Sequence, residues 1–146
     1  MLDQIEPCPF CVIGSGDVDQ DLVVLRTGDV FVIPTLKQRA ANHGQIIVLP
    51  VAHVTALHEA GPVLRAELFD VVATLTSTIQ DAFGATGSTV WQNNDAPGQD
   101  LSHLHIHVVP RFAGDDFVMP DRALGAAPRP LRAELAARLR RTLSRA

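Results

Sequence analysis

Three histidines stand at alternate positions near the middle of the second half of this chain, and they constrain the segment more than any other feature. His103, His105 and His107 are separated by the aliphatic residues Leu104 and Ile106. Alternate side chains of a β-strand lie on one face, so we expect three imidazoles about 6–7 Å apart, with the aliphatic side chains in the core. Folding alone does not require such a row, because burying the rings carries desolvation and, at low pH, charge repulsion. The row therefore indicates chemistry.

Two functional interpretations of this row compete with a plain one. Imidazole is the commonest metal-binding side chain, so the three rings could hold a metal ion directly. Alternatively, one ring is a nucleophile, and its neighbours prepare it or hold the substrate. The plain interpretation is a solvated sheet face that happens to be rich in histidine. We favour it least, because three consecutive histidines on one face are a much stronger signal than one.

The residues around the row extend the pattern. Gly98 and Gln99 precede it, and Pro110 and Arg111 follow it. Segment 98–111 resembles the motif of the histidine triad (HIT) superfamily of nucleotide hydrolases and transferases. Two upstream segments match its bacterial, zinc-containing branch, namely residues 8–11 (CPFC) and 44–53 (GQIIVLPVAH). The resemblance covers residues 8–111.

The resemblance implies a role for two of the three rings. His105 matches the family nucleophile, which attacks an α-phosphorus and forms a nucleotidyl-histidine intermediate, from which water releases a nucleoside monophosphate. An ordinary imidazole, with a pKa of about 6.5, is largely neutral at physiological pH and can attack through one nitrogen. In the family a backbone carbonyl holds the other nitrogen. His107 matches a catalytic ring that contacts the phosphate and supports charge in the transition state.

The resemblance also implies a substrate-binding turn before the row. Its backbone N–H groups would face the non-bridging phosphate oxygens. Relatives place an Asn or Gln near the phosphate or the leaving group at the position of Gln92. Asp100 stands where many relatives have a Ser or Thr, and an ionised carboxylate cannot donate a hydrogen bond to the leaving group. The residues assigned to substrate binding are Gln92, Gly98, Gln99, Asp100 and Leu101.

The two cysteines indicate a second candidate site. Cys8 and Cys11 form a C-x-x-C pair whose sulfurs can meet one metal ion. A redox pair or two idle thiols fit the same spacing, although the residues after Cys11 lack the helical pattern of a thioredoxin site. The HIT resemblance supplies two more ligands, His53 and His103. It implies a closed Cys2His2 zinc site, structural rather than catalytic, that ties the amino-terminal segment to the catalytic strand.

Length and composition fit one small enzyme. We interpret residues 1–146 as a single HIT-like domain, with a core over 8–111 and a carboxy-terminal loop and helix over 112–146. No apolar run approaches the ~20 residues of a membrane span, and no signal-peptide pattern is present. Two cysteines without a disulfide framework suit a reducing cytoplasm. The formal charge of −4 does not favour nucleic-acid binding. We therefore expect a cytoplasmic protein whose partner is a small nucleotide, with neither nucleic acid nor membrane as a partner.

The apolar pattern predicts an α+β fold. Helical spacing predicts a long helix over residues 62–83, stopped by Gly84, and leucines at intervals of four predict a carboxy-terminal helix (Leu131, Leu135, Leu139, Leu143). Short β-type runs predict five strands, over residues 22–25, 30–33, 46–49, 88–91 and 101–109. A mostly antiparallel sheet with the long helix on one face is the economical arrangement. It matches the HIT fold, whose subunits commonly pair, so we also expect a homodimer.

Two alternatives to a HIT-type hydrolase remain open. Many relatives carry an acid or amide after the second strand to bind ribose hydroxyls, whereas this chain reads VIPTL over residues 32–36. This departure and Asp100 leave room for a nucleotide-binding regulatory protein with little catalysis. A metallohydrolase with zinc on His103, His105 and His107 is less favoured because it leaves both cysteines idle. His43 and His58 are expected to lie in a loop and at a solvated position, outside the site.

Overall fold

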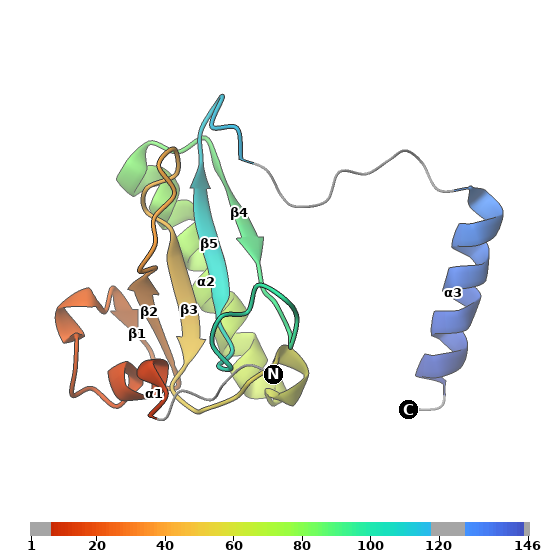
Figure 1. Ribbon diagram of the computed structural model, residues 1–146, viewed down its shortest axis with the longest axis horizontal. Coiled ribbons are helices and arrows are strands. Elements are labelled where there is room, and N and C mark those ends of the chain that lie inside the picture. The colour runs from red at the N-terminus through yellow and green to blue at the C-terminus, as the bar shows by residue number, and fades with distance from the viewer. Residues whose placement is uncertain (1–6, 118–127, 145–146) are drawn as a thin grey trace.

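The computed structural model describes residues 7–117 and 128–144 of the chain. Its centre is an antiparallel sheet in the order β1-β2-β3-β5-β4 (Figure 1). The strands are β1 (Leu25–Arg26), β2 (Val30–Pro34), β3 (Ile46–Pro50), β4 (Gly87–Trp91) and β5 (Ile106–Arg111). The predicted five-stranded antiparallel sheet is confirmed. Two of its three inner strands, β3 and β5, carry or adjoin most of the residues with metal-binding or nucleophilic side chains.

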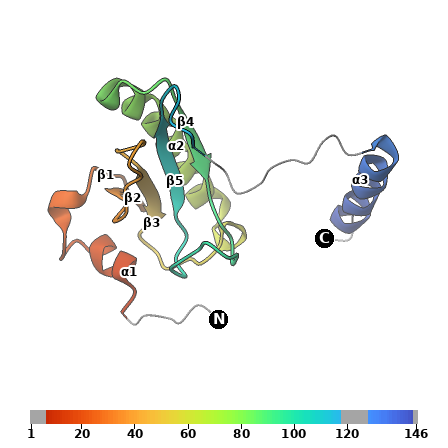
Figure 2. The same cartoon turned by 45° about the horizontal axis from the view of Figure 1, so that its top comes forward.

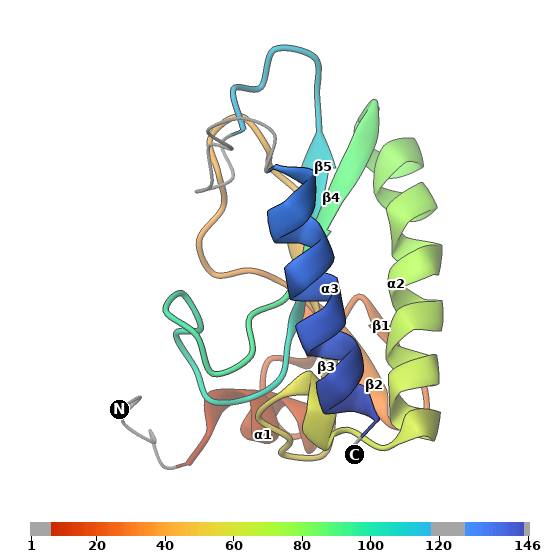
Figure 3. The same ribbon diagram turned by 90° about the vertical axis from the view of Figure 1, so that its right-hand side faces the viewer.

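One long helix, α2 (Pro62–Phe83), covers one face of the sheet, as predicted. It begins with a proline in its first turn, where a missing N–H does no harm, and ends at Gly84, whose φ of 65° suits glycine. Its buried side chains recur at helical spacing and pack against β2, β3 and β5 (Leu68, Val71, Val72, Leu75, Ile79). In Figure 3, α2 lies on one side of the sheet, and the loops that precede β3 and β5 lie on the other.

The opposite face of β2 and β3 is also buried, under a short helix, α1 (Pro9–Gly14). Alternate residues of these strands enter this second cluster (Phe31, Ile33, Ile47, Leu49), where Phe10 and Ile13 of α1 pack on them. Strands buried on both faces read as continuous apolar runs, as β2 and β3 do. This apolar cluster therefore holds α1 against the sheet, together with Cys11 inside the helix and Cys8 at its N-cap.

The structure corrects the predicted start of the last strand. β5 begins at Ile106, not at residue 101, so His103 and His105 precede the strand. The reason is local: the N–H of His103 bonds to the Leu101 carbonyl, and that of Leu104 bonds to Val54 rather than to a sheet neighbour. The predicted alternation nevertheless continues through this segment, because Leu104 and Ile106 are both buried in the α2-side core.

Two further boundaries differ from prediction. The strand expected over residues 22–25 is reduced to β1, because residues 20–22 form a 3-10 turn, η1 (Gln20–Leu22). Helix α1 was not predicted, since no helical pattern follows Cys11, yet Cys11 lies inside it and Cys8 is its N-cap. A six-residue helix is too short to show an apolar period.

The carboxy-terminal helix, α3 (Arg129–Leu143), forms where the leucine spacing predicts it. It stands apart from the sheet in Figures 1 and 2, and its four leucines are exposed.

A second 3-10 turn, η2 (Leu57–Glu59), precedes α2. Among the described helices, none combines the length and apolar character needed to cross a membrane.

Candidate active site and metal centre

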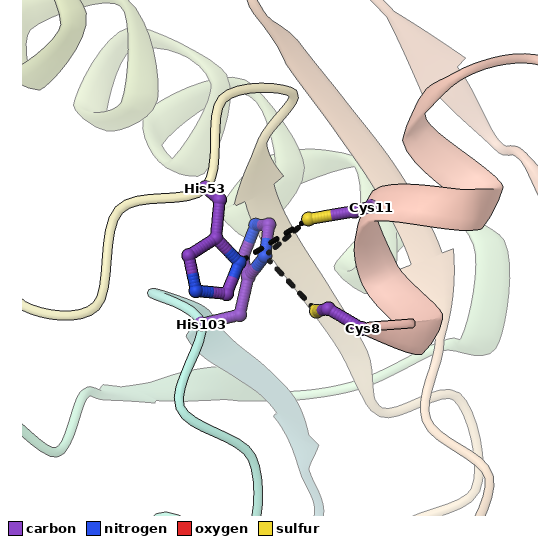
Figure 4. A group of neighbouring side chains, drawn as sticks. All are labelled: Cys8, Cys11, His53 and His103. Carbon is purple, nitrogen blue, oxygen red and sulfur yellow. Dashed lines mark hydrogen bonds between the residues drawn. The ribbon is translucent and has the colours of Figure 1, made fainter. Parts of the chain in front are cut away.

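Four metal-binding side chains from distant parts of the chain meet at one point (Figure 4). Cys8 is the N-cap of α1 and Cys11 lies inside this helix. His53 comes from the loop after β3, and His103 from the segment before β5. One ligand atom from each lies within 4.8 Å of all the others. The sequence-predicted ligand set is therefore assembled in the fold.

The spacing of these atoms fits a single four-coordinate ion. Both cysteine Sγ atoms lie 3.5 Å from His103 Nδ1, and Cys11 Sγ lies 3.2 Å from His53 Nδ1. Zinc bonds of about 2.3 Å to sulfur and about 2.0–2.1 Å to nitrogen give tetrahedral edges between S and N of roughly 3.6 Å. The donor atoms are thus already separated much as a tetrahedral centre requires, and two thiolates with two imidazoles are a preferred zinc set.

The His103 ring is oriented for this role by the backbone of β3. Its Nε2–H donates to the Pro50 carbonyl at 2.9 Å, so the Nδ1 lone pair faces the sulfurs. The ring is fully buried, and burial lowers its pKa to about 4, which keeps it neutral. Metal-bound histidines usually donate their second nitrogen in this way, which fixes both tautomer and orientation.

His105 presents a free ring nitrogen beside the metal-ligand cluster. Its Nδ1 lies 2.7 Å from the His103 carbonyl oxygen. Because a carbonyl can only accept, Nδ1 carries a proton and donates; in the neutral tautomer that this bond selects, Nε2 has the lone pair. The ring is half-buried between Phe10 at 5.6 Å and His107 at 4.9 Å, measured between ring centroids. The backbone bond and the two flanking rings thus fix the orientation of the His105 ring.

His107 lies on β5 and contacts one residue on each side, Gln45 next to β3 and Trp91 on β4. Gln45 Nε2, just before β3, donates to His107 Nδ1 at 3.0 Å, so His107 Nε2–H remains available to a substrate oxygen. Trp91 is the cross-strand partner of His107 on β4, and the two rings stack at 4.5 Å and 13°. Burial, followed by the charges of His105 and Arg39, lowers the pKa of His107 to about 4, while Asp100 acts in the opposite direction.

We expect His107 to make the stability of the protein depend on pH below neutrality. Well above pH 6.5 the His107 ring is neutral in both the folded and the unfolded protein. Between about pH 6.5 and 4 the ring binds a proton in the unfolded chain but stays neutral in the folded protein. The free energy of unfolding therefore falls as the pH falls through this window. After a discount for partial exposure of the ring, the loss is about 1–2 kcal/mol. Denaturant titrations of wild type and His107→Gln at pH 7, 5.5 and 4.5 measure it.

The variant should lose stability less steeply over this range than wild type. His58→Gln is the matched control, because His58 is exposed in η2. Equal pH slopes for wild type and His107→Gln would show that His107 is not the neutral buried ring described here.

The loop before His103 contains the turn that the sequence predicts to bind phosphate. Gly98 has a φ of 99°, a conformation that favours glycine. The Gln99 side chain is buried and engaged: Oε1 accepts from Asp95 N–H at 2.7 Å, and Nε2 donates to the Thr55 carbonyl at 3.0 Å. Gln99 thus shapes the turn with its side chain. Its backbone N–H is also engaged, because it donates to the Ala96 carbonyl at 3.1 Å.

The other substrate-binding candidates surround this turn. Gln92 turns into its own loop, where Nε2 donates to the Asn93 carbonyl at 2.5 Å and to Asn94 Oδ1 at 2.8 Å. Asp100 is exposed, and Leu101 is partly buried with its carbonyl bonded to His103 N–H. The fold therefore brings the turn to the triad, but it leaves the Gln92 amide engaged locally.

Sequence reasoning missed three residues that contact the triad rings. Phe10 meets both His103 and His105 edge-on, Gln45 bonds His107, and Trp91 stacks on it. Gln45 offered a signal, since it is a polar residue at the head of a buried strand. His43 is exposed in the β2–β3 loop and His58 is exposed in η2, in agreement with their exclusion from the site.

Residues 17–114 match the HIT domain family. One relative, Protein hit of Bacillus subtilis, is 31% identical over 114 residues, covering 77% of each chain. AP-4-A phosphorylase of Mycobacterium tuberculosis is 31% identical over 109 residues, covering 73% of this chain and 55% of the relative. Adenosine 5'-monophosphoramidase of Schizosaccharomyces pombe is 29% identical over 105 residues, covering 71% of this chain and 74% of the relative.

Solved structures agree in fold. A crystal structure of a Streptococcus mutans protein superposes with a TM-score of 0.82 at 30% identity, covering 96% of this chain and 87% of the other. A zinc-bound histidine triad family protein from Mycobacterium smegmatis superposes with a TM-score of 0.69 at 27% identity, covering 80% and 85%. The family match over residues 17–114 and the similarity to Protein hit agree with the triad seen in the structure, so the chain belongs to the HIT domain family.

Proposed function

We propose that this protein is a HIT-type hydrolase or transferase that attacks the α-phosphate of a small nucleotide and releases a nucleoside monophosphate. The hydrogen bond from His105 Nδ1–H to the His103 carbonyl carries the proposal, because it leaves Nε2 as the attacking atom. The names of the relatives, AP-4-A phosphorylase and adenosine 5'-monophosphoramidase, support nucleotide chemistry of this kind.

The reaction has two displacements. In the first, His105 Nε2 forms a bond to the α-phosphorus, and the bond from phosphorus to the leaving group breaks. A polyphosphate departs with the electron pair as an anion, and an amine departs after its nitrogen takes up a proton from solvent. In the second, water attacks the phosphorus, the N–P bond breaks, and the water's proton is lost to solvent or a base. Dividing the substitution in this way lowers each barrier. His107 Nε2–H donates to a non-bridging oxygen as charge develops, and the neutral state of that ring makes it a donor through this single nitrogen.

We further propose that zinc occupies the cluster of Cys8, Cys11, His53 and His103. The donor spacing, the donor types and the zinc-bound neighbour from Mycobacterium smegmatis support this assignment. With four protein ligands and no open position, zinc supplies structure rather than Lewis-acid chemistry. Its effect on the site is to fix His103, whose carbonyl in turn orients His105.

The remaining expectations on organisation stay proposals. We propose a cytoplasmic protein built as one HIT-like domain over residues 1–146. We also propose a homodimer. Exposed apolar side chains on α2 and on the edge strand β4 support pairing of two copies (Val63, Phe69, Phe83, Val90).

A substrate panel tests the proposed function. The purified protein is incubated with diadenosine tetraphosphate, adenosine 5'-phosphoramidate and adenylyl sulfate, and the products are separated by chromatography. We expect adenosine monophosphate from at least one substrate, with heavy oxygen incorporated from labelled water if hydrolysis is the second step. A guanosine series run in parallel reports the preference for the base.

A nucleotide-binding regulatory protein is the second candidate. Two observations favour it: Asp100 cannot donate a hydrogen bond to a leaving group, and residues 35–36 after β2 provide no acid or amide for the ribose. Tight binding of nucleotides by calorimetry, without monophosphate release from any member of the panel, would favour this function over the enzyme.

A further inference from the structure

A cationic side chain lies beside the triad in the loop between β2 and β3. The guanidinium carbon of Arg39 is 5.7 Å from the centroid of the Trp91 ring and 4.6 Å from that of Phe117. Trp91 in turn stacks on His107 at 4.5 Å. Arg39 is thus held against an aromatic pair, one member of which covers the ring that faces the substrate phosphate in the proposed mechanism.

The loop that carries Arg39 is fixed on both sides of this residue. Gln38 closes the base of the loop: its Oε1 accepts from the N–H groups of Gly44 and Gln45, and its Nε2 donates to the Gln45 carbonyl. Asn42 is buried, and its Nδ2 donates to the Pro110 carbonyl at 2.9 Å. Because these anchors flank Arg39 closely, the loop presents it at a set position. In Figure 3 this loop and the loop before β5 lie on the same side of the sheet.

The charge of Arg39 is available to a ligand, unlike that of a neighbouring arginine. Arg111 forms a two-pronged ion pair with Asp115, with N–O distances of 2.6 and 2.9 Å. Arg39 is exposed, and within residues 7–117 and 128–144 no carboxylate lies within ion-pair distance of it. Its charge still reaches the triad, because it contributes to the lowered pKa of His107.

A cation near the triad would offset the charge of Asp100 for one class of substrate. Its carboxylate acts on His107 with the opposite sign to Arg39 and would repel a negatively charged leaving group. A guanidinium binds phosphate oxygens in pairs and stays charged at any working pH. An uncharged amine leaving group would gain nothing from it.

We propose that Arg39 is a specificity-determining residue that binds the phosphates of the leaving group, so that the enzyme favours polyphosphate leaving groups over amines. This inference rests on the proposed function. It also predicts that Arg39 binds a free inorganic polyphosphate, with the aromatic pair Trp91 and Phe117 holding the guanidinium in place.

The test compares Arg39→Gln with Lys37→Gln, which removes the same charge from an exposed residue of the same loop. The substrates are diadenosine tetraphosphate and adenosine 5'-phosphoramidate, which give the same adenylyl intermediate and differ in the leaving group. We expect Arg39→Gln to lower kcat/KM for the tetraphosphate by about 10- to 100-fold, the range for a lost charged hydrogen bond, and for the phosphoramidate by at most about threefold. Lys37→Gln should change the ratio of the two values less than twofold, and Arg39→Lys should restore part of the loss.

A binding measurement separates this inference from the proposed function. Inorganic tripolyphosphate is titrated into each protein by calorimetry, with no turnover required. Weaker binding in Arg39→Gln alone supports the role of Arg39 even if wild type hydrolyses neither nucleotide, a result that would refute only the proposed function. Equal losses for both substrates, an unchanged kcat/KM ratio, or tripolyphosphate binding that is the same in wild type and Arg39→Gln would overturn the inference.

Discussion

Replacing His105 with alanine is expected to lower kcat by a factor on the order of 10³–10⁶, the range seen when an enzyme loses its nucleophile. The physical reason is that, within the part of the chain that the structure describes, Nε2 of His105 is the one triad ring nitrogen whose lone pair has no hydrogen-bond partner. His103 directs its lone pair at the cysteines, and His107 has its own engaged by Gln45. Steady-state release of adenosine monophosphate measures the effect.

The variant should keep its fold and its metal. His105 is not part of the donor cluster, so circular dichroism and zinc content should match wild type. His58→Ala, at an exposed position in η2, is the matched control and should retain full activity. Undiminished turnover in His105→Ala would remove His105 as the nucleophile and would favour attack by water.

The second large effect concerns the cysteines. In the double variant Cys8→Ser, Cys11→Ser, we expect the loss of one bound zinc per chain and a fall in Tm of about 10–20 °C. Structural zinc contributes many kcal/mol to folding, and each kcal/mol shifts Tm by about 2–4 °C in a chain of this size. Helix α1 and the His103 segment are the parts that the ion would join. Elemental analysis and thermal unfolding give the two readouts.

A chelator experiment on wild type provides the control. Zinc removal should lower its Tm toward that of the double variant, and added zinc should restore the Tm of wild type only. Activity should also fall on zinc removal, because His103 supplies the carbonyl that orients His105. Full zinc content in the double variant would contradict the Cys2His2 centre and would return the metal to the three histidines.

Much of the fold could be predicted because its elements follow simple apolar periods. The α2 helix shows a helical spacing and a glycine stop, and β2 and β3 show runs that are apolar on both faces. The start of β5 could not be predicted in this way. Residues 103–105 alternate as a strand does, but their backbone bonds go to Leu101 and Val54 rather than to a sheet neighbour. Alternation reports burial of side chains and does not report the partner of the backbone.

In the candidate site too, residues in local motifs could be predicted, and residues placed by tertiary structure could not. The metal set and the triad lie in compact motifs, CPFC and HLHIH, whose residue types already indicate their chemistry. Trp91 and Arg39 reach His107 only through the pairing of β4 with β5 and the fold of the β2–β3 loop. Their position depends on tertiary structure, and neither belongs to a local pattern. The side-chain bonds of two amides could not be predicted either: Gln92 bonds within its own loop, and Gln99 bonds both to that loop and to Thr55.

The covalent intermediate gives the most direct test of the account. The protein is mixed with diadenosine tetraphosphate, quenched in alkali during turnover, digested, and mapped by mass spectrometry. The account predicts an adenylyl group on the peptide that contains residues 103–107, with fragmentation placing it on His105. An adduct on another residue, or none while adenosine monophosphate is being released, would contradict it.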